Sequence, residues 1–265
     1  MVGTQENPGI MVLTLRDMFE AIHQDKDREY ELKVSYVEIY NEVIHDLLVQ
    51  NSKDTYLELR DDQFKGVTIA GVTETKVDDS KHVMNLLLQG NKRRTTEATN
   101  ANQTSSRSHA VFQITVSSKD KTKNTSVEIL NGKLSLIDLA GSERGSVTEN
   151  RGIRLMEGAK INRSLLSLAN CINALGDKAK KGFFVPYRDS KLTRMLKDSL
   201  GGNCKTVMIT TISPASTQYE ETVNTLKYAS RAKVYPELII KHRISKSRLF
   251  QIRRWSLCIF QLTST

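Results

Sequence analysis

Residues 134–144 read Leu-Ser-Leu-Ile-Asp-Leu-Ala-Gly-Ser-Glu-Arg, and this stretch decides the fold. Its first half is a short, mostly apolar run, which predicts a strand buried in a sheet with both faces covered. Asp138 stands near the carboxyl end of the predicted strand, where ligands bind in open α/β sheets, and Gly141 follows it. Such an acid can reach Mg²⁺ through water, and the glycine lets a backbone N–H approach a terminal phosphate. An ordinary turn from a strand into a loop explains the four residues 138–141, Asp-Leu-Ala-Gly, equally well.

A second polar motif precedes this stretch and decides between the two interpretations. Residues 102–109 read Asn-Gln-Thr-Ser-Ser-Arg-Ser-His, and residues 110–116 then alternate as a strand does. At a spacing of about thirty residues, the two motifs together resemble switch I and switch II of the kinesin motor domain. The resemblance covers roughly residues 1–233, and residues 203–206 most resemble the eighth kinesin family, whose members walk on and shorten microtubules. Further matching motifs lie at 161–166, 185–194, 200–203 and 224–229.

The resemblance implies an α/β fold of the P-loop NTPase type, with a central mixed, mainly β sheet flanked by helices. It also implies a Mg-ATP site in which the protein positions phosphates, metal and water. Asn102 would hold its loop near the phosphates, and Ser105 would order the attacking water. Ser106 and, through water, Asp138 would meet Mg²⁺, while the Gly141 N–H would detect the γ-phosphate.

Arg107 and Glu143 resemble the ion pair that joins the two switches and orders the water chain. Without the resemblance, two unrelated surface charges would be the simpler interpretation of these residues. His109 is expected to satisfy a hydrogen bond at a strand edge and to have no catalytic role.

The sequence departs from the family pattern at its amino end. A motor needs Gly-x-x-x-x-Gly-Lys-[Ser/Thr], whose backbone N–H groups and lysine hold the phosphates, and the sequence contains no such motif. Met1-Val2-Gly3 resembles a Met-x-Gly just downstream of that lysine, so we expect the P-loop and the first three strands of an eight-stranded sheet to be absent. We therefore expect this chain to hold Mg-ATP poorly and to hydrolyse it at no more than a trace rate. The strand expected near 207–212 should therefore lack some of the strands that would pair with it in the complete sheet.

Charge is distributed unevenly and points to an acidic partner. The chain has 265 residues and a formal net charge of +9. Residues 140–200 carry 12 Lys and Arg against 6 Asp and Glu, a net of +6. By resemblance this block meets acidic tubulin on microtubules, rather than nucleic acid. The expected contacts lie around the start of the long helix and in a single helical face at 188–194: Arg144, Arg151, Arg154, Lys160, Arg188, Lys191 and Arg194.

Composition suggests a protein of the cytoplasm, and the resemblance to kinesins implies association with the microtubule cytoskeleton. The mean hydropathy is -0.40, and no apolar run approaches the length of a membrane span. The three cysteines are scattered, which favours reduced thiols over a disulfide framework.

The pattern divides the chain into a partial motor domain at 1–233 and a basic tail at 234–265. The tail could be a membrane-surface or calmodulin-binding helix, or a segment unrelated to the motor, such as a misjoined coding end. On the last interpretation, deleting residues 238–265 should leave stability and microtubule affinity nearly unchanged.

Local patterns predict most of the remaining elements. Apolar residues at helical spacing predict helices at 11–22, 83–88 (stopping at Gly90) and 161–175. The basic residues 91–94 after Gly90 are interpreted as a solvated helix end. Strands are expected at 32–38, 56–60 and 67–72, the last two forming a hairpin, with a short helix ending near Leu48.

Three functions remain open from the sequence. The first is a kinesin-type motor fragment that couples ATP hydrolysis to movement in the parent family. The second is a microtubule-binding module that works without nucleotide, and the third is a non-functional product of truncation. A guanine-nucleotide switch is disfavoured because the sequence contains no Asn-Lys-x-Asp motif.

Overall fold

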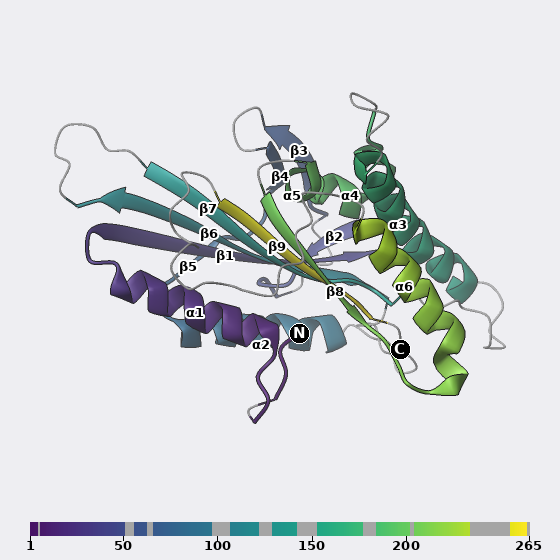
Figure 1. Ribbon diagram of the computed structural model, residues 1–265. Helices are drawn as coiled ribbons and strands as arrows, with labels where there is room; N and C mark the ends of the chain where they lie inside the picture. Colours follow the sequence, from purple (N-terminus) through teal and green to yellow (C-terminus); the bar gives the residue numbers. More distant parts are fainter. Residues whose placement is uncertain are drawn as a thin grey trace.

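A mixed seven-stranded sheet forms the centre of the computed structural model (Figure 1). The structure describes residues 1–4, 6–50, 56–62, 66–96, 107–121, 129–141, 153–176, 184–201, 204–233 and 255–263, with backbone alone at 95–96, 153–160 and 255–263. Across the sheet the order is β2-β1-β6-β7-β9-β8, and β5 pairs with β1 beside this path. The strands are β1 (Arg28–Tyr40), β2 (Val43–Asp46), β5 (Thr75–Val77), β6 (His109–Asp120), β7 (Ile129–Asp138), β8 (Cys204–Thr211) and β9 (Trp255–Thr263); β3 (Glu58–Asp62) and β4 (Gly66–Ala70) form a separate antiparallel hairpin.

The pairing directions bring several strand ends to one edge of the sheet. Strand β6 is antiparallel to both β1 and β7, while β7, β9 and β8 are mutually parallel. The carboxyl ends of β1, β7, β8 and β9 therefore lie at the same edge, together with the start of β6. This is the edge where an open α/β sheet binds ligands.

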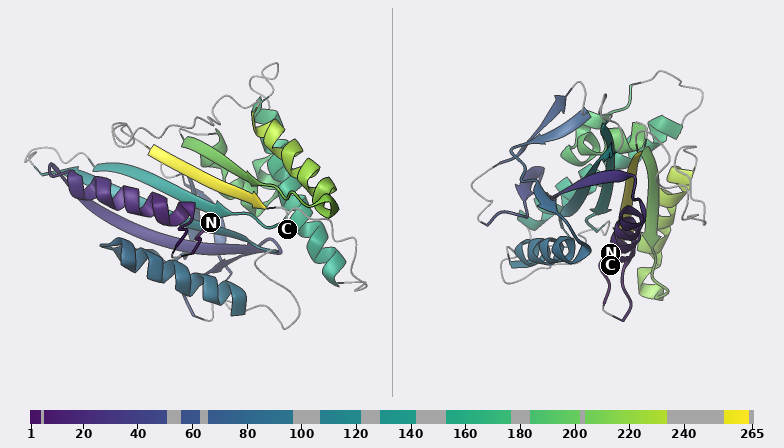
Figure 2. Two further views of the ribbon diagram at one scale, coloured as in Figure 1. Left: turned by 60° about the horizontal axis from the view of Figure 1, so that its bottom comes forward. Right: turned by 90° about the vertical axis from the view of Figure 1, so that its left-hand side faces the viewer.

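Helices cover both faces of the sheet (Figure 2). Alternate residues of β6 and β7 face opposite layers, as period-2 side chains must. Phe112 and Leu136 pack with the layer that contains α1 and α2, whereas Val111 and Ile137 pack with the layer that contains α3 and α4. The helices are α1 (Ile10–Gln24), α2 (Ser80–Thr96), α3 (Ile153–Gly176), α4 (Lys191–Met195), α5 (Lys197–Gly201) and α6 (Tyr219–Lys233), with 3-10 turns η4 (Tyr187–Asp189) and η5 (Ser216–Gln218).

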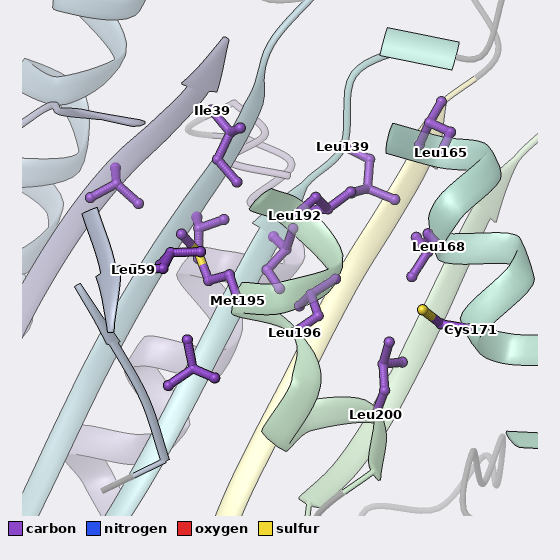
Figure 3. Close-up of a cluster of buried hydrophobic side chains, with 14 of the residues drawn as sticks. Ile39, Leu59, Leu139, Leu165, Leu168, Cys171, Leu192, Met195, Leu196 and Leu200 are labelled. Atoms are coloured by element: carbon purple, nitrogen blue, oxygen red, sulfur yellow. The ribbon is translucent and has the colours of Figure 1, made fainter. Parts of the chain in front are cut away.

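The core beneath α3 and α4 fixes the side of the molecule that carries the predicted basic residues. In Figure 3, Leu165 and Leu168 of α3 lie near Leu139, the residue that follows β7. Leu192 of α4 and Leu196, the residue that follows α4, enter the same cluster. Their nearly complete burial means that α4 is held by packing, since a five-residue helix has little stability of its own.

Most of the predicted elements are confirmed. The α/β fold, the hairpin β3–β4, and the helices that became α1 and α3 all occur where the apolar patterns placed them. Met11, Leu15, Met18 and Phe19 form the buried stripe of α1.

The short helix expected near Leu48 is wrong. Asn41 and Glu42 have positive φ angles of 57° and 65°, and the chain turns back directly into β2. Two consecutive residues of this kind suit a tight hairpin turn, in which asparagine is common and glutamate is not. Because Glu42 is an unusual residue for such a turn, the sequence pattern did not indicate it.

The predicted helix stop at Gly90 is also wrong. Helix α2 continues through Gly90 to Thr96. Glycine is needed there for space, because a Cβ at this position would overlap the ring of Tyr36. The basic residues that follow are therefore part of the helix.

Strand β9 gives β8 a neighbour that we did not expect from the sequence pattern. It pairs with β7 from Gly132↔Trp255 to Asp138↔Gln261, and with β8 from Cys204↔Ser256 to Thr211↔Thr263. The structure thus differs from the expectation of a separable tail, because residues 255–263 lie inside the motor sheet. Figure 1 shows β9 as the yellow strand between β7 and β8.

Candidate functional site

Three strands place an acidic pair at the sheet edge. Ala110 of β6 is the partner of Glu38 in β1 and of Asp138 in β7, so the three residues form one row across the sheet. Glu38 is buried, whereas the side chain of Asp138 is 35% exposed. Asp138 therefore has an open side at the edge where a ligand would bind.

Arg94, near the end of α2, reaches into this row. Its Nη1 donates to Asp138 Oδ2 at 2.9 Å, and its Nε lies 3.8 Å from Glu38 Oε1. The guanidinium also holds the start of β6, because Nε donates to Ser108 Oγ at 3.1 Å and Nη2 donates to the Ser108 carbonyl at 2.7 Å. With 4% exposure, Arg94 compensates two carboxylates where solvent contributes little. The sequence pattern of residues 91–94 indicates a solvated helix end, and for Arg94 that interpretation is wrong because its side chain is buried.

A small cavity with a mixed polar and apolar lining lies beside Asp138. Its volume is about 50 Å³, and Met1, Tyr36, Asn91 and Asp138 are among the residues that line it. The Tyr36 hydroxyl donates to Asn91 Oδ1 at 2.6 Å. Burial raises the pKa of Tyr36 to about 12, so this phenol remains a donor at physiological pH.

His109 joins the end of β7 to helix α3. The Ala140 N–H donates to His109 Nδ1 at 3.0 Å, and the other ring nitrogen, Nε2, lies 2.8 Å from Ser164 Oγ. Burial, with a smaller effect of the nearby Arg94 charge, lowers the pKa of His109 to about 3. The ring is thus neutral. The expected strand-edge hydrogen bond exists, and it is accompanied by a second bond to another element.

Several predicted site residues lie outside the described residues: Asn102, Ser105, Ser106, Glu143, Arg144 and Arg151. Arg154 and Lys160 lie in α3, where only the backbone is described. Arg107 stands at the turn that leads into β6, two residues before His109, and Gly141 follows the buried Leu139 and Ala140. The structure therefore brings the two predicted motifs to one edge through Ser108, His109 and Asp138.

The basic residues expected on one helical face occupy two short helices instead. Ser190 has an extended backbone (φ -149°, ψ 158°) that separates η4, with Arg188, from α4. Arg188 is exposed, and Lys191 is partly exposed. Arg194 Nη2 pairs with Asp61 Oδ2 of β3 at 2.9 Å, which holds the pKa of the Asp61 carboxyl below its usual value. The expectation of a single helical face is therefore wrong.

The described residues fit Mg²⁺ only in part. Asp138 supplies one hard oxygen ligand, which Mg²⁺ prefers. Among the described residues, however, no group of three or more His, Cys, Asp or Glu side chains could hold a metal ion. Asp138 is also already paired with Arg94.

Sequence reasoning missed Arg94 and the second bond of His109. The available signal for Arg94 was its position, since the carboxyl-terminal turn of α2 lies at the edge where β7 ends.

Within the described part of the chain, none of the helices has the length and apolarity that a bilayer crossing requires.

Comparison with known proteins agrees with this geometry. The profile described as "Kinesin motor domain" matches residues 1–235. Kinesin-like protein KIF19 of Homo sapiens is 58% identical over 234 residues, which cover 88% of this chain and 23% of that protein. Kinesin-like protein KIN-8B of Arabidopsis thaliana is 56% identical over 235 residues, covering 88% of this chain and 28% of that protein.

A solved structure of KIF14 with AMP-PNP on a microtubule has a TM-score of 0.79 and 40% identity, covering 89% of this chain and 67% of that one. The chain thus spans about a quarter of the length of the curated relatives. The expected resemblance is confirmed, and the chain belongs to the kinesin motor-domain family.

Proposed function

We propose that this chain is the microtubule-binding part of a kinesin-type motor, associated with the cytoskeleton in the cytoplasm. The observation that carries the proposal is the basic segment at residues 187–197, which the core and three specific contacts hold in place on the α3 side of the molecule. Two of the solved structures that match the fold are of KIF14 in complex with a microtubule.

The basic segment is supported from both ends. Glu42, in the turn between β1 and β2, accepts from the Lys191 N–H at 2.7 Å, and Ser190 Oγ accepts from the Thr193 N–H at 3.1 Å. Asp61 holds Arg194, as described above. These contacts fix the backbone at the amino end of α4, so the chain that carries Arg188 and Lys191 is positioned before any partner arrives. Preorganisation of this kind reduces the ordering cost of binding.

The Asp138 edge is the candidate site for nucleotide in the parent motor. When bound, Mg-ATP would supply the phosphate whose binding and loss drive movement in the family. Asp138 would hold the metal through water, and Gly141 would present its backbone N–H. Arg94 orients the Asp138 carboxylate through its hydrogen bond. Asp138, Gly141 and Arg94 would together position the nucleotide.

A second candidate function is microtubule binding without nucleotide. It is favoured by the ion pair between Arg94 and Asp138, which satisfies the carboxylate with a side chain of the protein itself. ATPase assays with saturating microtubules test the expectation, shared by both candidates, that this chain hydrolyses almost no ATP. We expect at most a trace rate, and robust turnover that Gly141→Ala abolishes would contradict this expectation.

Co-sedimentation with microtubules tests the proposed interface. Arg188→Glu with Lys191→Glu should weaken binding roughly ten-fold or more, because each reversal replaces an attraction of up to about 1 kcal/mol with a repulsion. Arg194 is left unchanged, since its substitution would break the ion pair with Asp61.

The matched control reverses two exposed lysines elsewhere, Lys26→Glu and Lys81→Glu, and makes the same change in net charge. Wild-type binding should weaken as salt is added, because electrostatic association is screened. Equal losses from the two double variants would indicate general charge attraction and would refute a defined interface.

A further inference from the structure

A chain of three directed hydrogen bonds crosses the core from the loop after β7 to helix α3. It begins at the backbone N–H of Ala140, one residue before Gly141, and passes through His109 to Ser164. Ser164 Oγ then lies 2.7 Å from the Ile161 carbonyl within α3. Ala140, His109 and Ser164 are 0%, 3% and 2% exposed, so water does not replace any of these partners at low cost.

The backbone donor determines the direction of the whole chain. A backbone N–H can only donate, so His109 Nδ1 must accept from Ala140 and the ring proton must lie on Nε2. Nε2–H then donates to Ser164 Oγ, whose own hydrogen donates to the Ile161 carbonyl. One tautomer satisfies every group, and the other would leave two N–H donors facing each other.

We propose that His109 is a positioning residue that couples the loop carrying Gly141 to the placement of helix α3. The imidazole is rigid and uses both nitrogens, so a shift of Ala140 must move the ring and Ser164 with it, or break a buried hydrogen bond. The inference rests on the proposed function, because α3 lies on the side of the molecule assigned to the microtubule.

The ring remains suited to this role over the physiological range. Burial lowers the pKa of His109 to about 3, so the ring stays neutral and Nδ1 stays an acceptor. The charged group facing the ring is Arg94, which opposes protonation further.

The test is hydrogen exchange of the Ala140 amide in the full chain, read by NMR. Ser164→Ala removes the acceptor of Nε2–H and leaves that donor buried and unsatisfied. We expect Ala140 to exchange about ten-fold faster, while the ¹⁵N shifts of the His109 ring keep the pattern of the Nε2–H tautomer, because the Ala140 N–H still makes Nδ1 the acceptor.

Ser167→Ala is the matched control. Ser167 is also buried in α3 and its hydroxyl donates to a helix carbonyl, that of Arg163, at 2.9 Å, but it does not contact His109 in this structure. A second pair, Ser164→Thr and Ser164→Val, compares equal shapes with and without the hydroxyl. Only Thr should preserve slow exchange at Ala140. Equal exchange in Ser164→Ala and Ser167→Ala, or in Thr and Val, would overturn the coupling.

Microtubule co-sedimentation of the same variants provides the second readout. Ser164→Ala should change affinity by roughly three-fold or more relative to Ser167→Ala, within the usual range of coupling between sites. If Ser164→Ala speeds exchange of the Ala140 amide but leaves the affinity for microtubules equal to that of Ser167→Ala, the proposed effect of His109 on the microtubule-binding side is overturned. If even the wild-type chain fails to bind, the proposed function fails, while the exchange measurement still decides the link through His109.

Discussion

Proline at the middle of β9 should destabilise the whole sheet. Ile259 is paired with Leu136 of β7 on one side and Val207 of β8 on the other, so its backbone lies in the interior of a parallel sheet. Ile259→Pro removes an N–H donor, and the partner carbonyl loses its hydrogen bond inside the sheet. The ring also obstructs pairing with the adjacent strand.

The expected loss is about 3 kcal/mol of unfolding free energy, the sum of an unsatisfied carbonyl at about 1–3 kcal/mol and local distortion. A domain of this size loses roughly 2–4 °C per kcal/mol, so the melting temperature should fall by about 6–12 °C. This is a large part of a total stability of about 5–15 kcal/mol.

Thermal unfolding followed by circular dichroism measures this change, with Ile259→Val as the control that keeps the N–H and the β-branch. Hydrogen exchange should show the loss first in β8, whose neighbour in the sheet is β9, and later in β1 and β6. Melting temperatures of the two variants within about 2 °C of each other, well below the shift expected for proline, would refute the placement of residues 255–263 in the sheet.

Three further predictions concern the sheet edge. Gly90→Ala should lower stability by about 1–3 kcal/mol in urea unfolding, because overlap with Tyr36 outweighs the better helix propensity of alanine. Arg94→Met should cost about 3–5 kcal/mol by leaving buried Glu38 uncompensated, and adding Glu38→Gln should recover part of that loss. His109 binds a proton in the unfolded chain below pH 6.5 but in the folded chain only near pH 3, so acidification between these values should reduce stability by up to about 1.4 kcal/mol per pH unit. His109→Asn should lack this component in unfolding measured at about pH 7 and about pH 5, on either side of the ordinary histidine pKa.

The parts of the fold that the sequence predicted are those in which local pattern and tertiary packing agree. The apolar stripe of α1 has one buried face, so its period alone identifies the helix. The sequence also placed Asp138 near the carboxyl end of a buried strand, and in the structure it is the last residue of β7. These features require no knowledge of distant contacts.

Three of the errors have a different physical origin, because each depends on a partner far away in the chain. Gly90 looks like a helix stop until the ring of Tyr36 is placed against it. Arg94 looks like a solvated residue until Asp138 and Glu38 meet it. The sequence of β9 does not indicate where this strand pairs, because its two neighbours in the sheet, β7 and β8, come much earlier in the chain.

The position of β9 also has a consequence for the order in which the fold can form. Residue 136 pairs with residue 259, and residue 207 pairs with residue 259, so the middle of the sheet is assembled from segments that are synthesised at widely separated times. Until residues 255–263 arrive, β7 and β8 each present a row of unpaired backbone groups. Long-range parallel pairing is slow because loop closure precedes any stabilising contact. Nascent chains should therefore depend on chaperones during this interval, and a slow refolding phase should accompany the closing of the sheet at its centre.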